Sequence, residues 1–139
     1  MRKLFVDTNI IIDLLAKRDQ FYEVAAKLFS LADKKKVELI VSSLSCANTN
    51  YVLSKLKTSE IAREILSKFK VLITVADLTD KILELSLTDK SFKDFEDGLQ
   101  YYSAIEYEAE LIITRNLKDF RSSSLPVLSA KSYFGTLKT

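Results

Sequence analysis

Short apolar runs alternate along this chain with stretches in which apolar residues recur every three or four positions. The short runs are typical of buried strands and occupy residues 4–6, 37–41, 71–75, 111–113 and, more briefly, 126–128. The helical spacing between them predicts helices over 10–15, 21–32, 42–56, 61–69, 82–87 and 94–108. Strands that alternate with helices indicate a three-layer α/β/α sandwich with a mostly parallel central sheet of four to five strands. We expect one domain over residues 1–139.

Composition agrees with a globular chain that lies away from membranes. Apolar residues make up 47% of the sequence and charged residues 29%. No apolar run approaches the ~18 residues that a membrane span needs, and the N-terminus lacks the pattern of a signal peptide. The lone Cys46 has no partner for an internal disulfide, which is typical of a cytoplasmic protein.

The residue types that are missing exclude several kinds of chemistry. The chain has no histidine, one cysteine and two glycines, Gly98 and Gly135. Histidine-dependent triads, cysteine-rich zinc sites and glycine-rich phosphate loops are therefore ruled out. Any catalysis must use carboxylates, amides, hydroxyls, lysine and arginine.

Acidic residues follow three separate segments of the predicted sheet. Asp7 ends the first strand, the helix over 94–108 begins with Asp94, Glu96 and Asp97, and Asp119 follows the fourth strand. Ligands of parallel sheets bind beyond the carboxyl ends of the strands, so we expect these carboxylates at one edge. Clustered carboxylates repel one another unless a cation joins them, and oxygen ligands suit Mg²⁺ or Mn²⁺. The spacing predicts a divalent-metal site.

Each acid also has a purely structural interpretation, which the sequence leaves open. Asp7 or Thr8 is suited to capping the helix that follows. Asp94 and Asp97 stand where acids stabilise a helix N-terminus. Asp119 fits an ordinary turn.

Three ordered motifs resemble those of the PIN-domain ribonucleases, and among them the VapC-type toxins of bacterial toxin–antitoxin pairs. The motifs are VDTNIIIDLL, DFEDGLQYYSA and IITRNLKDF, and the resemblance extends from Phe5 to about Leu128. It implies a Mg²⁺- or Mn²⁺-dependent endoribonuclease that hydrolyses RNA. It also implies a cognate antitoxin as partner and self-association as a homodimer.

The resemblance assigns roles to individual residues. Asp7, Asp97 and Asp119 match the acidic metal-site positions of the family. The polar positions beside the first and last acids correspond to Thr8, Asn9, Thr114 and Asn116, which would orient ligands or water. Arg115, which lies between Thr114 and Asn116, is a candidate to bind an RNA phosphate or to support the metal ligands. Lys118 is a second candidate to bind phosphate.

One position departs from the family pattern. The helix after the second strand usually carries a Glu in the pattern S-x-L-x-x-x-E, and this chain has Asn48 there. An amide supplies an oxygen but neither a negative charge nor a base. Asp94, one helical turn before Asp97, is a possible replacement and a further candidate catalytic residue. The alternative function is a catalytically weak or inactive PIN module that binds RNA or a protein.

Two other α/β enzyme classes use an aspartate after the first strand. Phosphatases of the haloacid dehalogenase type need D-x-D there, whereas this chain has Asn9 as the third residue. Receiver domains need neighbouring acids at the first strand and a lysine after the last one, and neither feature is evident. Both classes fit the sequence less well than a PIN domain.

Overall fold

The computed structural model describes residues 1–137, in which strands and helices alternate as the sequence predicts, and it adds a helix over residues 130–136 that was not predicted. The strands are β1 (Arg2–Val6), β2 (Val37–Ser42), β3 (Thr74–Ala76), β4 (Leu111–Ile113) and β5 (Val127–Leu128). The helices are α1 (Thr8–Leu15), α2 (Tyr22–Asp33), α3 (Ser43–Leu56), α4 (Ser59–Phe69), α5 (Asp80–Thr88), α6 (Phe95–Glu106) and α7 (Ala130–Thr136). Two short 3-10 turns span Lys70–Leu72 and Leu117–Phe120.

All five strands form one parallel sheet in the order β3-β2-β1-β4-β5. The first strand lies in the centre, where Leu4 is in register with Leu39 on one side and Leu111 on the other. Because β1, β2 and β4 are parallel neighbours, their carboxyl ends meet at the same edge of the sheet. The residues that follow these strands are thereby brought together.

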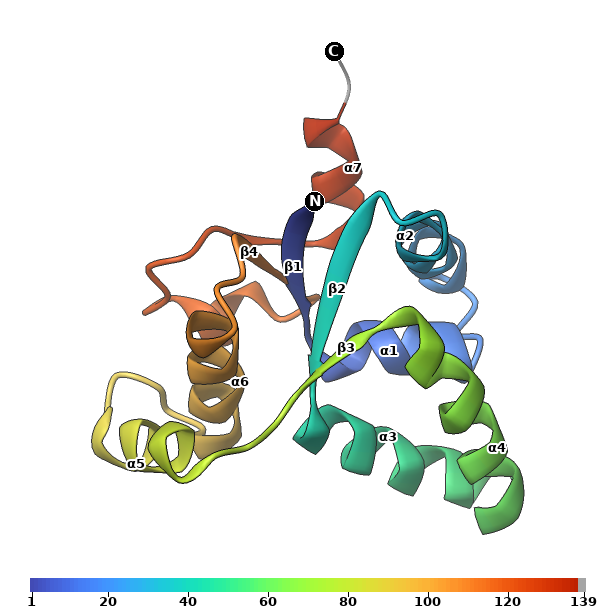
Figure 1. The fold of residues 1–139 in the computed structure, drawn as a ribbon, viewed down its shortest axis with the longest axis horizontal. Coiled ribbons are helices and arrows are strands. Elements are labelled where there is room, and N and C mark those ends of the chain that lie inside the picture. The colour runs from blue at the N-terminus through green and yellow to red at the C-terminus, as the bar shows by residue number, and fades with distance from the viewer. Residues whose placement is uncertain (138–139) are drawn as a thin grey trace.

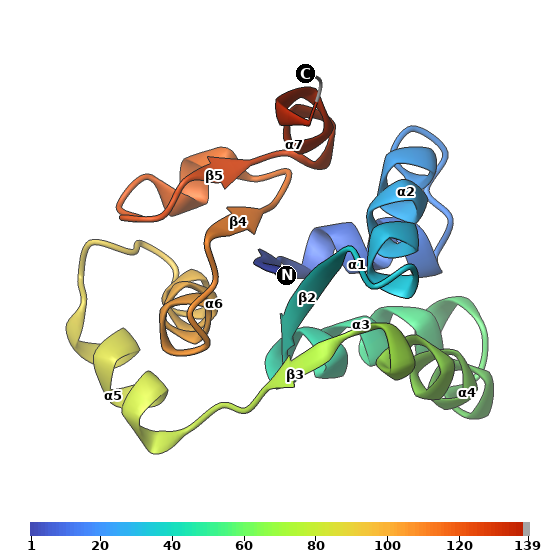
Figure 2. The ribbon, with the colours of Figure 1, turned by 45° about the horizontal axis from the view of Figure 1, so that its top comes forward.

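Helices cover both faces of the sheet (Figures 1 and 2), which confirms the three-layer architecture. Alternate residues of β1 point to opposite sides: Leu4 and Val6 pack in one hydrophobic cluster and Phe5 packs in the other. The first cluster contains residues of α1, α2 and α7, and the second contains residues of α6. Burial of apolar side chains on both faces holds α6 and α1 against the same strand.

The third strand differs from its prediction. Residues 71–75 read as one apolar run, but Lys70–Leu72 continues α4 as a 3-10 turn and the strand occupies Thr74–Ala76. Val71 is 84% exposed on that turn. A short apolar run does not distinguish a buried strand from a helix end, and here the preceding helix extends into it.

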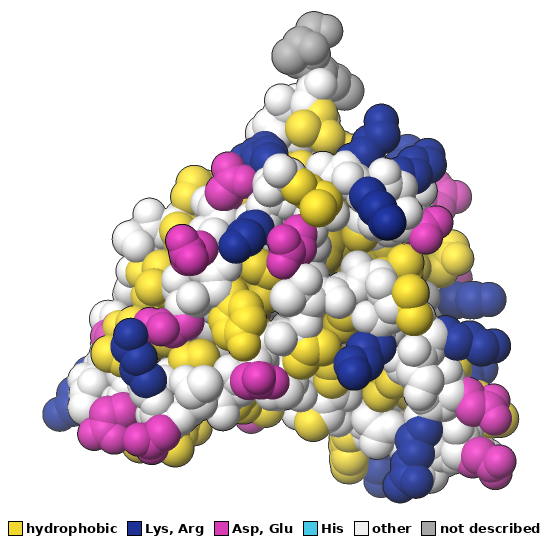
Figure 3. All heavy atoms as spheres, in the orientation of Figure 1, with side chains coloured by type: hydrophobic (Ala, Val, Ile, Leu, Met, Phe, Trp, Pro, Cys, Tyr) yellow, Lys and Arg dark blue, Asp and Glu magenta, His cyan; other side chains and the backbone are white. Residues whose placement is uncertain are grey.

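Basic side chains are unevenly distributed over the surface. On the face that Figure 3 shows, lysine and arginine side chains (dark blue) gather toward α2 and α4. Lys34, Lys35 and Lys36 follow α2 and are exposed. Among residues 1–137, no helix is long and apolar enough to cross a lipid bilayer.

Candidate functional site

Asp7 lies where the central strand β1 passes into α1. Its backbone N–H donates to the carbonyl of Ile113, at the end of β4, over 3.0 Å. Its carboxylate caps α1 by accepting a hydrogen bond from the backbone N–H of Thr8 at 2.8 Å. Asp7 is only 7% exposed. The capping role that the sequence allowed is therefore real, but it uses only one of the two carboxylate oxygens.

Uncharged donors from three other side chains also contact the Asp7 carboxylate. Oδ1 accepts from Gln100 Nε2 at 3.0 Å. Oδ2 accepts from Thr114 Oγ1 at 2.7 Å and from Asn9 Nδ2 at 3.3 Å. No base forms an ion pair with Asp7 among the residues that the structure describes. The carboxylate is therefore held in one orientation by uncharged donors, with no basic side chain from the described residues paired to it.

Gln100 is central to this network and was not predicted from the sequence. Its amide is 3% exposed and donates to Ser45 Oγ at 2.8 Å, while its carbonyl oxygen accepts from Ser42 Oγ. Ser42 ends β2 and caps α3, so Gln100 joins α6 to the ends of two strands. Its place one turn after Asp97, on the same side of the helix, is the signal that sequence reasoning overlooked.

The acidic side chains gather around Asp97, in the first turn of α6. Burial and the nearby charges of Asp119, Asp94, Asp7 and then Glu96 raise the pKa of Asp97 to about 7. Burial and nearby like charges each disfavour the ionised form of a carboxyl group. The structure thus brings together the acids that the sequence places on separate segments.

Asp119 is positioned by the residue that follows it. Phe120 is 2% exposed and packs in the same hydrophobic cluster as Phe92, which anchors the 3-10 turn Leu117–Phe120 beside α6. The backbone N–H of Asp119 donates to the carbonyl of Asn116 at 3.1 Å and closes this turn. Asp119 of this turn lines a cavity together with Asp94 and Asp97 at the start of α6.

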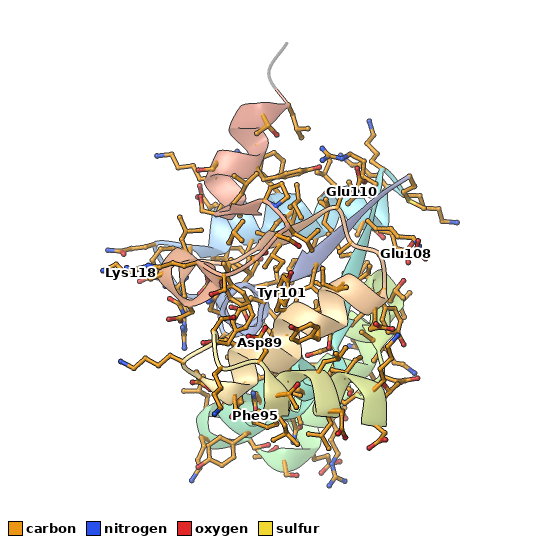
Figure 4. All side chains as sticks on the ribbon, turned by 90° about the vertical axis from the view of Figure 1, so that its left-hand side faces the viewer. Asp89, Phe95, Tyr101, Glu108, Glu110 and Lys118 are labelled. Carbon is orange, nitrogen blue, oxygen red and sulfur yellow. The ribbon has the colours of Figure 1, made fainter. Side chains whose placement is uncertain are left out.

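Two adjacent cavities meet at the acids. The smaller has a volume of about 270 Å³ and is lined by residues that include Asp7, Asn48, Glu96, Asp97 and Asn116. The larger, of about 890 Å³, shares Asp94 and Asp97 with it and adds Asp119. Its wall also carries three bases, which are Lys93, Lys118 and Arg121. Figure 4 shows Lys118 and Phe95, which both line the larger cavity.

Comparison with known proteins identifies the family. The profile of the PIN domain matches residues 3–118. The chain belongs to the PIN-domain family. It is similar to Ribonuclease VapC1 of Aquifex aeolicus, with 30% identity over 138 residues that cover 94% of this chain and 92% of that protein.

Solved structures share the PIN fold along nearly their whole length. VapBC2 from Rickettsia felis, bound to a DNA fragment from its promoter, is 24% identical, with a TM-score of 0.67 and coverage of 91% of this chain and 97% of that one. A toxin–antitoxin complex from Klebsiella pneumoniae is 23% identical, with a TM-score of 0.69 and the same coverage. VapBC-1 from nontypeable Haemophilus influenzae is 18% identical, with a TM-score of 0.70 and coverage of 93% and 98%.

The PIN match includes Asp7 and Asp97 and ends one residue before Asp119. The three carboxylates suit a hard divalent cation, because the residues that crowd Asp97 are acids and the donors are all oxygen. Within residues 1–137, however, no three acidic side chains already lie close enough to form a finished metal centre. A bound cation would have to draw the side chains together.

Asn9 and the segment after β4 support Asp7 in this PIN site. Asn9 Nδ2 donates to Thr114 Oγ1 at 3.2 Å, and its Oδ1 accepts from the backbone N–H of Arg115 at 3.2 Å. Thr114 Oγ1 also accepts from the backbone N–H of Asn116 at 3.0 Å. Thr8 Oγ1 lies 2.7 Å from Ser45 Oγ, in the Gln100 network. The predicted polar positions therefore surround Asp7.

The Arg115 side chain points to a different part of the molecule. Its guanidinium donates to both carboxylate oxygens of Asp13, at 2.8 and 3.0 Å, and lies 3.9 Å from the ring centre of Phe21. Asp13 is 1% exposed and is also 3.8 Å from Arg18. Since the guanidinium neutralises a buried acid, only the backbone of Arg115 contributes to the polar site.

Asn48 faces the site from α3, as its family position implies. Its Nδ2 donates to Glu96 Oε1 at 3.3 Å, and both side chains line the smaller cavity with Asp7. Asp94 caps α6 through a hydrogen bond of 2.8 Å from the backbone N–H of Glu96 to its Oδ1. The sequence interpretation named Glu96 among the acids of this segment but gave it no role in the site.

Proposed function

We propose that this protein is a divalent-metal-dependent endoribonuclease that hydrolyses RNA phosphodiester bonds, and that it is the toxin of a toxin–antitoxin pair. The observation that carries the proposal is the convergence of Asp7, Asp94, Asp97 and Asp119 at one sheet edge, where burial and the nearby charges of the other acids raise the pKa of Asp97 to about 7. Membership of the PIN family and similarity to Ribonuclease VapC1 support RNA hydrolysis as the reaction at this acidic site.

The acids would hold the metal, and their neighbours would keep them in place. Asp7, Asp97 and Asp119 are the proposed ligands of Mg²⁺ or Mn²⁺. A bound divalent cation supplies a more acidic water and neutralises charge that develops on the phosphodiester. Gln100 and Thr114 fix the orientation of the Asp7 carboxylate through hydrogen bonds of 3.0 and 2.7 Å, which supports a preorganised ligand.

RNA would lie along the wall of the larger cavity. Lys93, Lys118 and Arg121 line it beside Asp94 and Asp97, and none of these bases forms an ion pair within residues 1–137. Lysine and arginine that are free of acidic partners neutralise phosphates with little loss of existing contacts. The three bases therefore offset the repulsion between the RNA backbone and the acids.

A catalytically weak or inactive PIN module is the second candidate. Asn48 favours it, since an amide stands where the family usually has Glu. The test uses a labelled RNA and purified protein, with Mn²⁺ or with a chelator. Cleavage that needs the metal and disappears in Asp97→Asn supports the enzyme. Unchanged RNA binding without cleavage at any metal concentration supports the module.

The proposed partners are an antitoxin and a second copy of the chain. The solved relatives include a toxin–antitoxin complex, and arginine pairs well with the carboxylates of such a site. We expect both partners in the cytoplasm. Co-expression with the neighbouring reading frame should give a stable complex, and sedimentation of the isolated chain should show a dimer. Free expression without toxicity or such a neighbour would argue against the toxin role.

A further inference from the structure

Asn48 and Glu96 face each other across the gap between α3 and α6. The amide nitrogen of Asn48 donates to Glu96 Oε1 at 3.3 Å, and both residues line the 270 Å³ cavity with Asp7 and Asp97. From this contact we infer that Glu96 supplies the carboxylate that position 48 lacks and that Asn48 is its positioning residue. The inference rests on the proposed metal site and adds a fourth acid to it.

The location of Glu96 suits this role. It directly precedes Asp97 in the first turn of α6, where the helix dipole favours negative charge. Gln100, one turn further along α6, already contacts Asp7, so this side of the helix borders the site. An acid at position 96 can therefore reach the cavity from α6, whereas the usual family acid reaches it from α3.

The amide at position 48 is the complementary change. An amide donates a hydrogen bond to a carboxylate, while a glutamate in its place would repel Glu96. Among residues 1–137, Asn48 is the one side chain that hydrogen-bonds the Glu96 carboxylate. One oxygen of Asp94 accepts from the backbone of α6, so Asp94 already serves as a helix cap. Glu96 is the acid that contacts position 48 itself, which makes it the better replacement for the missing acid.

Mn²⁺ titration of the metal-free protein tests the role of Glu96. Binding is followed by calorimetry and by the shift in melting temperature, neither of which depends on RNA cleavage. The matched control is Glu60→Gln, since Glu60 is also exposed and also the second residue of a helix, α4. We expect Glu96→Gln to weaken Mn²⁺ binding by at least about tenfold. Equal affinity of Glu96→Gln and Glu60→Gln would overturn the inference.

Moving the charge back to α3 gives the sharper test. In the double variant Asn48→Glu with Glu96→Gln, the acid and the amide exchange sides, so Mn²⁺ affinity should rise well above that of Glu96→Gln alone. Adding Asn48→Glu to the wild type should raise Mn²⁺ affinity less than adding it to Glu96→Gln does, because the glutamate introduced at position 48 and Glu96 carry like charges and would repel each other. A double variant that binds as weakly as Glu96→Gln would overturn the exchange.

The wild-type titration separates the two levels of the argument. If the wild-type chain gives neither binding heat nor a melting shift with Mn²⁺, the proposed metal site itself is wrong. If the wild type binds Mn²⁺ and Glu96→Gln binds it equally well, the metal site stands and only the role of Glu96 is refuted.

Discussion

Gln100 Nε2 donates a buried hydrogen bond of 3.0 Å to Asp7 Oδ1 and thereby joins α6 to the end of the central strand. Through Ser42 and Ser45 the same amide also reaches the end of β2 and the first turn of α3. Two of the segments that carry the acids are therefore fixed relative to each other by one uncharged side chain. Because Gln100 is uncharged, it fixes the position of the Asp7 carboxylate without forming an ion pair with it, and a cation could still bind there.

Replacement of Gln100 by leucine should lower the free energy of unfolding by about 1–3 kcal/mol, because it removes one buried hydrogen-bond partner each from Asp7, Ser42 and Ser45. Urea denaturation measures the change. Gln20→Leu is the control, since Gln20 is exposed and its replacement should stay within about 0.5 kcal/mol. Equal effects of the two variants would show that the network adds no stability.

Stability without metal should depend on pH through Asp97. Its pKa is raised to about 7 in the folded protein, above the ~3.9 of an unfolded chain. The folded state therefore binds the proton more tightly, and the free energy of unfolding should fall as pH rises from about 4 to about 7. Asp97→Asn removes this contribution, so its melting temperature in chelator should exceed that of the wild type at pH 8. Parallel pH profiles of the two proteins would contradict the assignment.

The Arg115 side chain should matter for stability rather than for RNA. Arg115→Met leaves Asp13 buried beside the more distant Arg18, and we expect a loss of about 3 kcal/mol. Arg2→Met is the control, because the ion pair between Arg2 and Glu110 is half exposed and should contribute under about 1 kcal/mol. If Arg115→Met were as stable as wild type and bound RNA less well, a direct RNA contact would be the better assignment.

Lys93, Lys118 and Arg121 should account for part of the salt dependence of RNA binding. Each phosphate contact to a single strand contributes about 0.7 to the slope of log affinity against log salt. We therefore expect each alanine variant to reduce that slope by about 0.7, measured in the Asp7→Asn background to prevent cleavage. Lys34→Ala, in the exposed run after α2, is the control and should leave the slope unchanged. Slopes that all match the control would place the RNA elsewhere.

The sheet was predictable because its strands are buried on both faces and read as short apolar runs. The runs at 4–6 and 111–113 lie in β1 and β4. Because these strands are parallel neighbours, the acids that come after them in the sequence were expected at the same edge of the sheet. The run at 71–75 was misleading, since a 3-10 turn at the end of α4 carries its first two residues.

Side-chain contacts within the site were less predictable. Phe95 is one of the apolar residues whose spacing predicts the helix over 94–108, yet it is 41% exposed, while the polar Gln100 is 3% exposed. Apolar periodicity detects the side of a helix that meets a hydrophobic core, and α6 also meets a polar network at its N-terminal end. The pairing of Asn48 with Glu96 joins residues 48 positions apart, which no local pattern records.

The rate of RNA cleavage by wild type, Asp7→Asn and Asp19→Asn, with Mn²⁺ and with chelator, tests the central claim most directly. Asp19 is an exposed aspartate outside the site, so its replacement controls for the loss of one charge. We predict metal-dependent cleavage by wild type and Asp19→Asn, and only background cleavage by Asp7→Asn. Cleavage by Asp7→Asn at the wild-type rate, or by the wild type in chelator, would contradict a metal-dependent nuclease centred on Asp7.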